Sequence, residues 1–337
     1  MLGAIDRSRF EVIPVGITRE GAYVLESDDP ARFALDPDHL PEVVDNGTRV
    51  RWPESTSSRE LTVTDASGER SLGDVDVVFP ILHGRFGEDG TIQGLLELVG
   101  LPYVGNGVLA SAIGMDKHVT KTVLEGAGIA VAPWITVTRA ALDADRELWE
   151  RRARALGLPV FVKPARAGSS VGVTKVGDWA ELDAALEVAF AEDRTALIEA
   201  AVVGREIECA VLEGRAGGAV RVSVAGEVVV TGREFYDFAA KYLDAPGVDL
   251  ICPADLGDGE VFELQRIAHR AFEAIGGEGL ARVDVFLTGE GFIVNEVNTM
   301  PGFTPISMFP TCWLNSGLSY PELITELIEV GHARGIR

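Results

Sequence analysis

The sequence predicts an α/β protein built from two or three domains. The chain has 337 residues, which is enough for more than one hydrophobic core. Unbroken apolar runs at residues 10–18 and 75–82 are typical of strands that are buried on both faces of a sheet. Between residues 112 and 200, strand-like segments alternate with helix-like ones, which is the order expected of an α/β fold.

Local signals define the other elements of the N-terminal third. Residues 27–73 are rich in Asp, Pro, Ser and Arg, and we interpret them as loops with a minor hairpin. Residues 90–100 predict a helix that ends at Gly100, because glycine stops helices and Pro102 follows shortly after. This part of the chain therefore combines two buried strands with irregular segments and a helix.

The remaining elements follow from capping residues and hydrophobic periodicity. Residues 115–128 predict a helix with Asp116 as its N-cap and a stop at Gly126 or Gly128. Farther along we expect strands at 206–213 and 219–230, a helix at 259–275, a β-hairpin at 280–298 and a final amphipathic helix from Pro321.

The composition limits the possible partners and the compartment. The formal net charge is −22, and such a field repels nucleic-acid phosphates and anionic lipid surfaces. No signal peptide opens the chain, and no apolar run approaches the length of a membrane span. Cys209, Cys252 and Cys312 are widely spaced and form no metal motif, which favours buried or half-buried thiols in a reducing compartment. We therefore expect a soluble cytoplasmic protein without nucleic-acid or membrane partners.

A lysine stands at the junction between an apolar strand and a glycine-serine loop. Lys163 ends the run of residues 160–164, and the small residues of 167–172 follow. Only five of the 30 basic residues are lysines, so a compact ammonium at this position is a selective choice. Backbone N–H groups of such a loop can cradle an anion, with the lysine as a point charge. The alternative is a plain β-hairpin with a lysine reaching into solvent at its end.

The predicted hairpin at residues 280–298 contains the most specific pairing. If residues 289–291 form its loop, Thr288 faces Phe292, and the pairing continues inward along both strands. Every second residue of each strand then lies on the same face of the sheet.

This register places acidic residues directly opposite each other. Asp284 faces Glu296, and Arg282 faces Asn298, with all four side chains on one face. Opposed carboxylates destabilise a sheet, and a cation between them would remove the repulsion. Two carboxylates and an amide oxygen suit Mg²⁺ or Mn²⁺. The alternative is an acidic face in contact with solvent, where Arg282 offsets part of the negative charge.

Six motifs occur in one order along the chain: HGRFGEDGTIQG, MDKHVTK, VKPARAGSSVGV, FYDFAAKYL, ARVDVFL and NEVNTMPGFTPIS. Together they closely resemble the D-alanine–D-alanine ligases of the ATP-grasp superfamily, from about residue 1 to the C-terminus. The resemblance implies a doubly wound N-terminal domain at residues 1–111. A two-subdomain ATP-grasp fold follows, with subdomains at 112–200 and 201–337 that hold ATP between them.

The resemblance also implies an activity. ATP phosphorylates the carboxylate of one D-alanine, and the amine of a second D-alanine displaces phosphate to give D-alanyl-D-alanine for peptidoglycan precursors. Two Mg²⁺ or Mn²⁺ ions and a homodimer are expected. A ligase that joins D-alanine to D-lactate or D-serine is the near alternative, and an ATP-grasp protein that binds nucleotide without ligating is the distant one.

Roles in nucleotide binding are implied by position in the motifs. The ATP phosphates are expected to contact Lys117, Lys163 and the loop residues Ser169 and Ser170. Ser169 is also expected to help place the amino acid. Adenine and ribose contacts fall to Glu199, Ala200, Ala201, Val202 and Glu206. Glu208 shares a strand face with Glu206, so the choice between them depends on the resemblance alone. Without it, Lys117 would be an ordinary exposed helix lysine.

Roles at the reacting groups are implied in the same way. Asp284, Glu296 and Asn298 match the metal ligands, and Arg282 and Gly302 match the groups that stabilise the developing oxyanion. His83, Ser307 and Met308 match the amino-acid site, although each residue type in isolation is more often structural. Within the predicted lid at residues 233–248, Lys241 is assigned to the nucleotide and Tyr242 to closure and substrate choice.

One family motif has no counterpart. Family members carry an earlier strand and a Gly-Gly-x-Ser-x-Glu-His turn, whose glutamate helps to hold the first D-alanine, and nothing before Phe10 matches it. The expectation is that the chain as given binds ATP but ligates poorly, or that its true start lies upstream. The alternative is that another carboxylate, Glu88 or Glu11, substitutes.

Overall fold

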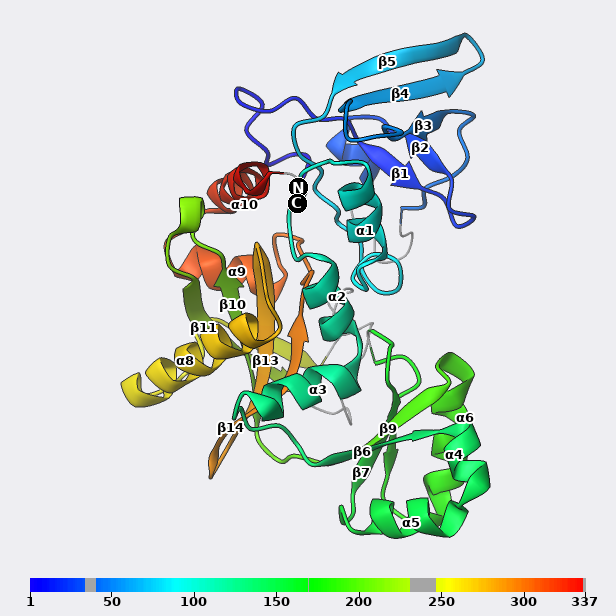
Figure 1. Ribbon diagram of the computed structural model, residues 1–337. Helices are drawn as coiled ribbons and strands as arrows, with labels where there is room; N and C mark the ends of the chain where they lie inside the picture. The colour runs from blue at the N-terminus through cyan, green and yellow to red at the C-terminus, as the bar shows by residue number, and fades with distance from the viewer. Residues whose placement is uncertain (34–40, 169, 231–246, 336–337) are drawn as a thin grey trace.

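The computed structural model describes residues 1–33, 41–168, 170–230 and 247–335, and the strands among them form four sheets (Figure 1). Two small sheets lie in the N-terminal part. A four-stranded sheet and a five-stranded sheet make up the rest, and the functional residues gather between these two larger sheets.

The N-terminal part begins with short antiparallel strands. They are β1 (Val15–Ile17), β2 (Tyr23–Leu25), β3 (Arg49–Arg51), β4 (Glu60–Asp65) and β5 (Gly68–Asp74), with a 3₁₀ turn at Pro30–Phe33. β1 pairs with β2, and β3, β4 and β5 form a meander. The predicted strand at residues 10–18 is thus shorter than expected, and the region 27–73 contains more strand than a minor hairpin.

The apolar run at residues 75–82 is half-buried, packs against neighbours on two sides and is not a full strand. Val77, Phe79 and Ile81 pack against the core of the C-terminal sheet, whereas Val75 and Val78 pack against the helix that follows. A single parallel bridge joins Val78 to Tyr103. Where a doubly wound sheet was expected, the parallel pairing in the described N-terminal residues is this single bridge, with one helix between its two residues.

Three helices connect this part to the rest. They are α1 (Thr91–Leu98), α2 (Val108–Met115) and α3 (Lys117–Gly126). Both predicted ends are confirmed: α1 stops before Gly100, whose φ is +70°, and Asp116 caps α3 by accepting from the N–H groups of His118 and Val119 at 3.0 and 3.2 Å. Glycine at +70° avoids the strain that a side chain would meet there.

The four-stranded sheet has the order β6-β9-β7-β8, and all its pairs are antiparallel. Its strands are β6 (Trp134–Thr138), β7 (Val160–Pro164), β8 (Thr174–Val176) and β9 (Thr195–Ala200). One face carries α4 (Arg139–Ala144), α5 (Arg146–Arg154) and α6 (Leu182–Glu192), with a 3₁₀ turn at Trp179–Glu181. The strand pair β7–β8 encloses the glycine-serine loop, so that segment is a hairpin in topology.

The five-stranded sheet has the order β12-β11-β10-β13-β14 and is also antiparallel. Its strands are β10 (Arg205–Leu212), β11 (Arg221–Val230), β12 (Val248–Ile251), β13 (Leu280–Thr288) and β14 (Gly291–Asn298), with a 3₁₀ turn at Arg215–Gly217. Strand β10 buries alternate residues on the two faces: Ile207 and Cys209 pack with α8 (Asp258–Ala274), and Ala210 and Leu212 pack with α9 (Met308–Asn315) and α10 (Tyr320–Arg334).

The hairpin register is as predicted at the acidic pair but not at the loop. The loop has two residues, so Thr288 pairs with Gly291 and not with Phe292. A β-bulge at Asn295 adds one residue to β14, and Asp284 therefore still faces Glu296. The two departures from the simple model cancel.

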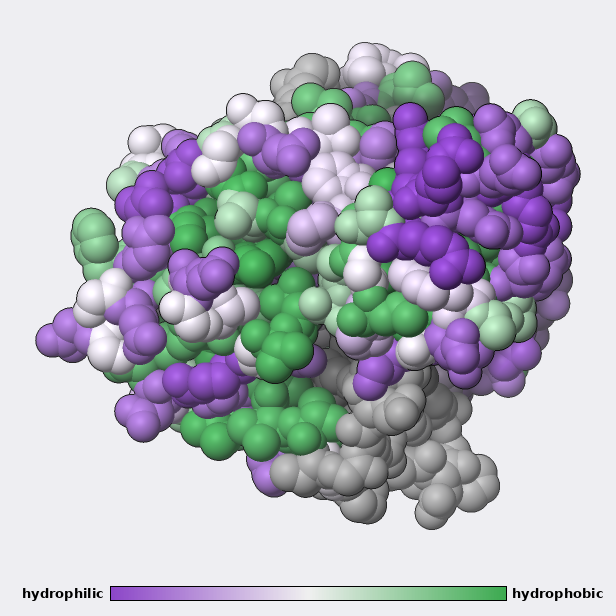
Figure 2. Space-filling model, turned by 90° about the horizontal axis from the view of Figure 1, so that it is seen from below, coloured by the Kyte–Doolittle hydropathy of each residue, from purple (hydrophilic) through white to green (hydrophobic). Residues whose placement is uncertain are grey.

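Polar and apolar surface are unevenly distributed in the view from below (Figure 2). Hydrophilic residues are dense on the side that carries α5 and α6, and apolar residues are more frequent on the side of the five-stranded sheet. Among the residues that the structure describes, no helix is both long and apolar enough to span a membrane.

Candidate active site

A cavity of about 450 Å³ lies between the four-stranded and the five-stranded sheets. It brings together ten of the residues predicted from the sequence: Lys117, Lys163, Ser170, Glu199, Ala200, Ala201, Val202, Glu206, Asp284 and Glu296. Lysines line it from α3 and β7, and carboxylates line it from β10, β13 and β14. The cavity therefore has a cationic wall and an anionic wall.

The glycine-serine loop leaves β7 directly after Lys163 and turns sharply. Ser170 has φ +59°, an uncommon conformation for a residue with a side chain. At Gly172, with φ +72°, a Cβ atom would lie 3.0 Å from Glu192 and 3.1 Å from Pro164, so both the backbone conformation and the space favour glycine. The loop is thus a tight turn at the mouth of the cavity.

The start of α3 holds this loop. The backbone N–H of Lys117 donates to the Ala165 carbonyl at 2.9 Å, and its Nζ donates to the Ala167 carbonyl at 2.7 Å. Lys117 is half-buried, so the alternative of an ordinary exposed lysine is wrong. Its ammonium is held at the loop by a backbone oxygen.

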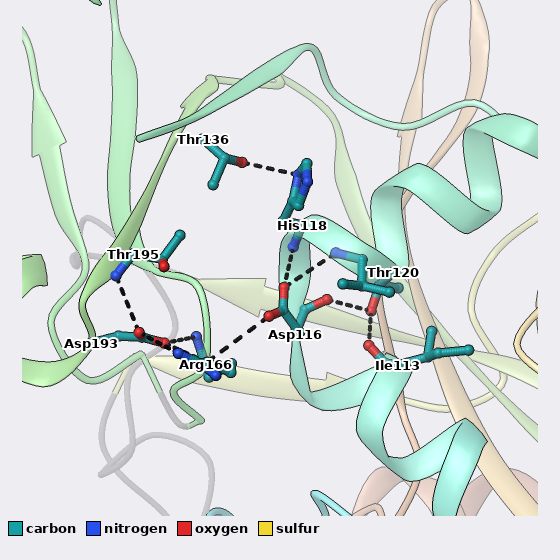
Figure 3. A network of polar contacts seen from close by, with 9 residues as sticks. Ile113, Asp116, His118, Thr120, Thr136, Arg166, Asp193 and Thr195 are labelled. Carbon is teal, nitrogen blue, oxygen red and sulfur yellow. Dashed lines mark hydrogen bonds and ion pairs between the residues drawn. The ribbon is translucent and has the colours of Figure 1, made fainter. Parts of the chain in front are cut away.

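Arg166 fastens the other side of the same loop (Figure 3). Its guanidinium donates to both oxygens of Asp193 at 2.8 Å and lies 3.9 Å from Asp116, the N-cap of α3. Burial would raise the pKa of Asp193, but the hydrogen bonds from Arg166 and from the Thr195 N–H outweigh it and lower that pKa. One carboxylate thereby joins the loop to β9.

Glu199 is buried between two lysines. Its carboxylate contacts Lys163 through one oxygen and Lys121 through the other. Burial favours the protonated acid, but the two ammonium charges outweigh it and lower the pKa of Glu199. Lys163 is consequently not a lysine reaching into solvent, as the hairpin alternative supposed.

The connection from β9 to β10 forms another edge of the cavity. The N–H groups of Ala200 and Ala201 donate to the carbonyls of Pro133 and Pro159, at 2.9 and 3.1 Å, and these bonds fix its path. Val202 and the half-buried Glu206 follow along the cavity wall. This arrangement presents backbone and one carboxylate to the same space.

The anionic wall spans three neighbouring strands. Glu208 on β10 pairs with Asp284 on β13, which pairs in turn with Glu296 on β14. Arg282 donates to both oxygens of Asp284 at 2.7 Å, and its Nε lies 3.0 Å from Glu208. Asn298, opposite Arg282, donates to Asp284 at 2.9 Å.

This acidic face is buried at Glu208, Arg282 and Asp284 and half-buried at Glu296 and Asn298. Glu208, Arg282 and Asp284 are 5, 9 and 7% exposed. The sequence-based alternative was therefore wrong about solvation but right that Arg282 offsets part of the negative charge. Three carboxylates, those of Glu208, Asp284 and Glu296, thus lie side by side on neighbouring strands, and the guanidinium of Arg282 contacts two of them, Glu208 and Asp284.

The donor set fits a hard divalent cation. The described residues contain no group of three or more His, Cys, Asp or Glu side chains arranged as a complete metal site. Mg²⁺ does not need one, because it is commonly bound by one or two carboxylates together with water and phosphate oxygens. Asp284 and Glu296 line the cavity from adjacent strands and could supply those carboxylates.

Residues of the HGRFGEDG motif approach this wall from the N-terminal part. His83 is partly exposed, and its Nδ1 lies 3.1 Å from the Met300 carbonyl. Glu88 accepts a hydrogen bond from the Gly84 N–H. Burial, helped by the charge of Glu296, raises the pKa of Glu88 to about 7.

The predicted amino-acid site is only partly supported by side-chain positions. Met308 is buried and packs against β11, where a Cβ on Gly226 would overlap its sulfur. Ser307 precedes α9, and its hydroxyl lies 2.7 Å from that of Thr304. Gly302 is buried in the segment after β14. These three residues do not line the cavity. Helix α9 begins at Met308, directly after Ser307.

Three predicted residues, Ser169, Lys241 and Tyr242, lie outside the described residues. Lys121 and Glu208 are among the cavity residues that were not predicted as part of the site. Lys121 stands four positions after Lys117, hence on the same face of α3, and this spacing could have indicated it. Glu208 was noted only as a neighbour of Glu206, and its contact with Arg282 depends on strand pairing that the sequence does not reveal.

Comparisons with known proteins agree along the whole chain. The model of the D-ala D-ala ligase N-terminus matches residues 1–106, and that of the D-ala D-ala ligase C-terminus matches residues 123–329. A D-alanine–D-alanine ligase of Paenarthrobacter aurescens is 51% identical, over 99% of this chain and 89% of that protein. One of Kineococcus radiotolerans is 52% identical, over 99% of this chain and 91% of that protein.

Solved structures agree as well. The D-alanine-D-alanine ligase from Coxiella burnetii superimposes with a TM-score of 0.81 at 35% identity, over 99% of this chain and 87% of that one. The VanG D-Ala:D-Ser ligase from Enterococcus faecalis gives a TM-score of 0.83 at 34% identity, over 98% and 92%. The fold is accordingly that of the ATP-grasp ligases, and the chain belongs to the D-alanine–D-alanine ligase family.

Proposed function

We propose that this chain joins two D-alanines to D-alanyl-D-alanine at the expense of ATP, with the cavity between the two larger sheets as the ATP site. The observation that supports this most directly is the pairing of a lysine wall with a buried carboxylate wall across one cavity. Triphosphate needs cations, and an acyl transfer through an acyl phosphate needs a charge-stabilised site from which water is excluded.

The cationic wall would receive the phosphates. Lys117 holds its ammonium group at the loop of residues 165–173, which contains Ser170, and Lys163, just before the loop, holds its ammonium group at Glu199. Ser169 would close the loop over the phosphates and help to place the first amino acid. Adenine would lie along Ala200, Ala201 and Val202 with the ribose against Glu206, and Glu199 would orient Lys163 beside it.

The anionic wall would receive the metal ions. Asp284, Glu296 and Asn298 would hold Mg²⁺ or Mn²⁺, two ions in all, which neutralise phosphate charge when bound. Arg282, kept in place by Asp284 and Glu208, would stabilise the negative charge that develops on the carbonyl oxygen, together with the Gly302 N–H.

The amino acids would bind between this wall and the HGRFGEDG motif. His83 is held at the Met300 carbonyl, close to the segment that leads to α9. A carboxylate at the N-terminus of α9, near Ser307 and the Met308 N–H, would be favoured by the helix dipole. Lys241 would contact the nucleotide, and Tyr242 would close the site and favour an amine as second substrate.

Product analysis tests the proposal. The protein is incubated with ATP, Mg²⁺ and D-alanine, alone or with equal D-lactate or D-serine, and phosphate release and products are measured by mass spectrometry. We expect D-alanyl-D-alanine as the main product in every mixture at neutral pH. Phosphate release without dipeptide, or a main product containing D-lactate or D-serine, would contradict it. We further propose that the protein is a cytoplasmic homodimer. Light scattering of the purified protein tests this oligomeric state.

A further inference from the structure

Two of the three cysteines meet behind the cavity. Cys252 follows β12 and Cys312 lies in α9, sixty positions later in the chain, and their sulfur atoms are 3.9 Å apart. Cys312 is buried, whereas Cys252 is half-buried. Cys209 packs on the opposite face of β10, in the core cluster with α8. The close pair is therefore Cys252 with Cys312.

The two thiols are chemically unequal. Hydrogen bonds from Cys312 and from the Asn315 amide lower the pKa of Cys252, against the opposing effect of burial. The contact with Cys252 and burial raise the pKa of Cys312 well above its usual value. Cys252, which has the more accessible sulfur, is thus the thiol that ionises more readily. An oxidant-sensitive cysteine is typically an accessible thiolate with a second thiol beside it.

We propose that Cys252 and Cys312 are a redox-active pair that hydrogen peroxide converts into an intramolecular disulfide. The Cys252 thiolate attacks one peroxide oxygen, the O–O bond breaks, and the departing hydroxide takes a proton to become water. The sulfur of Cys312 then attacks Cys252 sulfenic acid. The S–S bond forms, the S–O bond breaks, and the hydroxyl leaves as water with the Cys312 proton. Two thiols are oxidised, and one peroxide is reduced to two waters.

The surroundings decide which side of the pair moves. The sulfurs must approach from 3.9 Å to the disulfide length of about 2.05 Å. Met308 at the start of α9 packs closely on Gly226 of β11, which leaves little room for that end of the helix to shift toward the sheet. Among the described strands, β12 lies at the edge of its sheet and pairs with β11 alone, and Leu250 and Ile251 are each 44% exposed. The end of β12 therefore moves toward α9.

This movement connects the pair to ligation. The bond would tie β12 to α9, which begins at Met308 of the proposed amino-acid site. Only α9 belongs to the proposed amino-acid site, so this consequence depends on the proposed function. Oxidation is expected to lower the rate of dipeptide formation, and reduction with dithiothreitol is expected to restore it.

Peptide mapping tests the pair directly. The full chain is treated with hydrogen peroxide and alkylated under denaturing conditions without reductant, and its free thiols are counted by mass spectrometry. We expect one free thiol, at Cys209, and a cross-linked peptide pair containing Cys252 and Cys312. Three free thiols, a disulfide that includes Cys209, or Cys252 sulfinic acid without a cross-link would overturn the proposal.

Variants separate the disulfide from its effect. Cys209→Ala keeps the pair and should still cross-link and lose activity reversibly. Cys252→Ser should neither cross-link nor lose activity on oxidation. Because Cys252 is only half-buried, this variant does not place a new polar group in the core. A disulfide that forms in the wild type without a change in rate would overturn the link to ligation. A reduced enzyme that makes no dipeptide would instead contradict the proposed function, and the mapping result would still decide the pair.

Discussion

At the scale of single residues, the two carboxylates of the anionic wall should respond differently to neutralisation. Asp284 accepts two hydrogen bonds from the buried Arg282, whereas Glu296 faces Asp284 across the strands. Glu296→Gln and Asp284→Asn should each lower turnover by about 100-fold or more, because the proposed metal site loses a hard anionic ligand. From the sequence alone, relief of repulsion predicts equal or higher stability for both variants.

The structure restricts that stability prediction to Glu296. Asp284→Asn weakens the partner of a buried guanidinium and should cost about 1–3 kcal/mol, with Glu208 limiting the loss. Urea unfolding of both variants measures this difference. Glu290→Gln, at the exposed turn of the same hairpin, is the matched control and should change neither stability nor rate. Equal stability losses in the Asp284 and Glu296 variants would contradict the assignment.

Glu88 should make stability depend on pH. Its pKa is about 7 in the folded protein, above its usual value of 4.5. Between these values the folded state keeps a proton that the unfolded state has released. The free energy of unfolding should therefore fall as pH rises from about 4.5 to about 7, by at most about 1.4 kcal/mol per pH unit.

Glu88→Gln should remove this contribution and flatten the profile. Unfolding with urea at several pH values measures the slope for the wild type and the variant. The exposed Glu54→Gln provides the comparison and should leave the slope unchanged. If the Glu88 variant retained the wild-type slope, the carboxyl group would not titrate in this range.

At the scale of elements, the anchor of the glycine-serine loop should control ATP binding. Asp193 is buried and joins Arg166 of the loop to β9 (Figure 3). Asp193→Asn should cost about 1–3 kcal/mol of stability and raise the KM for ATP, because the loop loses its fixed geometry. The bidentate pair Arg139–Glu187 has the same chemistry at the surface, so Glu187→Gln should change stability by less than about 1 kcal/mol. Steady-state kinetics and thermal unfolding compare the two, and an unchanged KM in the Asp193 variant would count against the anchor.

At the scale of the whole molecule, Asn106 joins the N-terminal part to the five-stranded sheet. Its buried amide donates to the carbonyls of Leu280 and Thr299, at 2.6 and 2.8 Å, and accepts from the Glu278 N–H at 2.8 Å. Asn106→Leu would leave three backbone groups without these partners and should cost about 3 kcal/mol or more. Asn46 makes a similar set of backbone contacts at the surface, and Asn46→Leu should cost much less because water replaces them. Similar midpoints of urea unfolding for the two variants would show that Asn106 does not hold the parts together.

Much of the fold could be predicted because its signals are local. The ends of α1 and α3 follow from Gly100 and Asp116, whose effects act within one helical turn. The facing of Asp284 and Glu296 follows from the two-residue period of strands, although the loop and the bulge at Asn295 each departed from the simple register. The strand expected at residues 75–82 failed because burial on both sides does not require sheet pairing.

The sequence by itself determined which residue types stand at the site and in what order, since motifs and capping residues are local properties of the chain. Only the tertiary structure decided their partners. Lys121 reaches Glu199, Arg282 reaches Glu208, and Cys252 reaches Cys312 across 78, 74 and 60 positions. Such contacts depend on how two sheets and their helices pack. The charge balance of the cavity depends on that packing as well, because burial and the nearest opposite charge set each pKa.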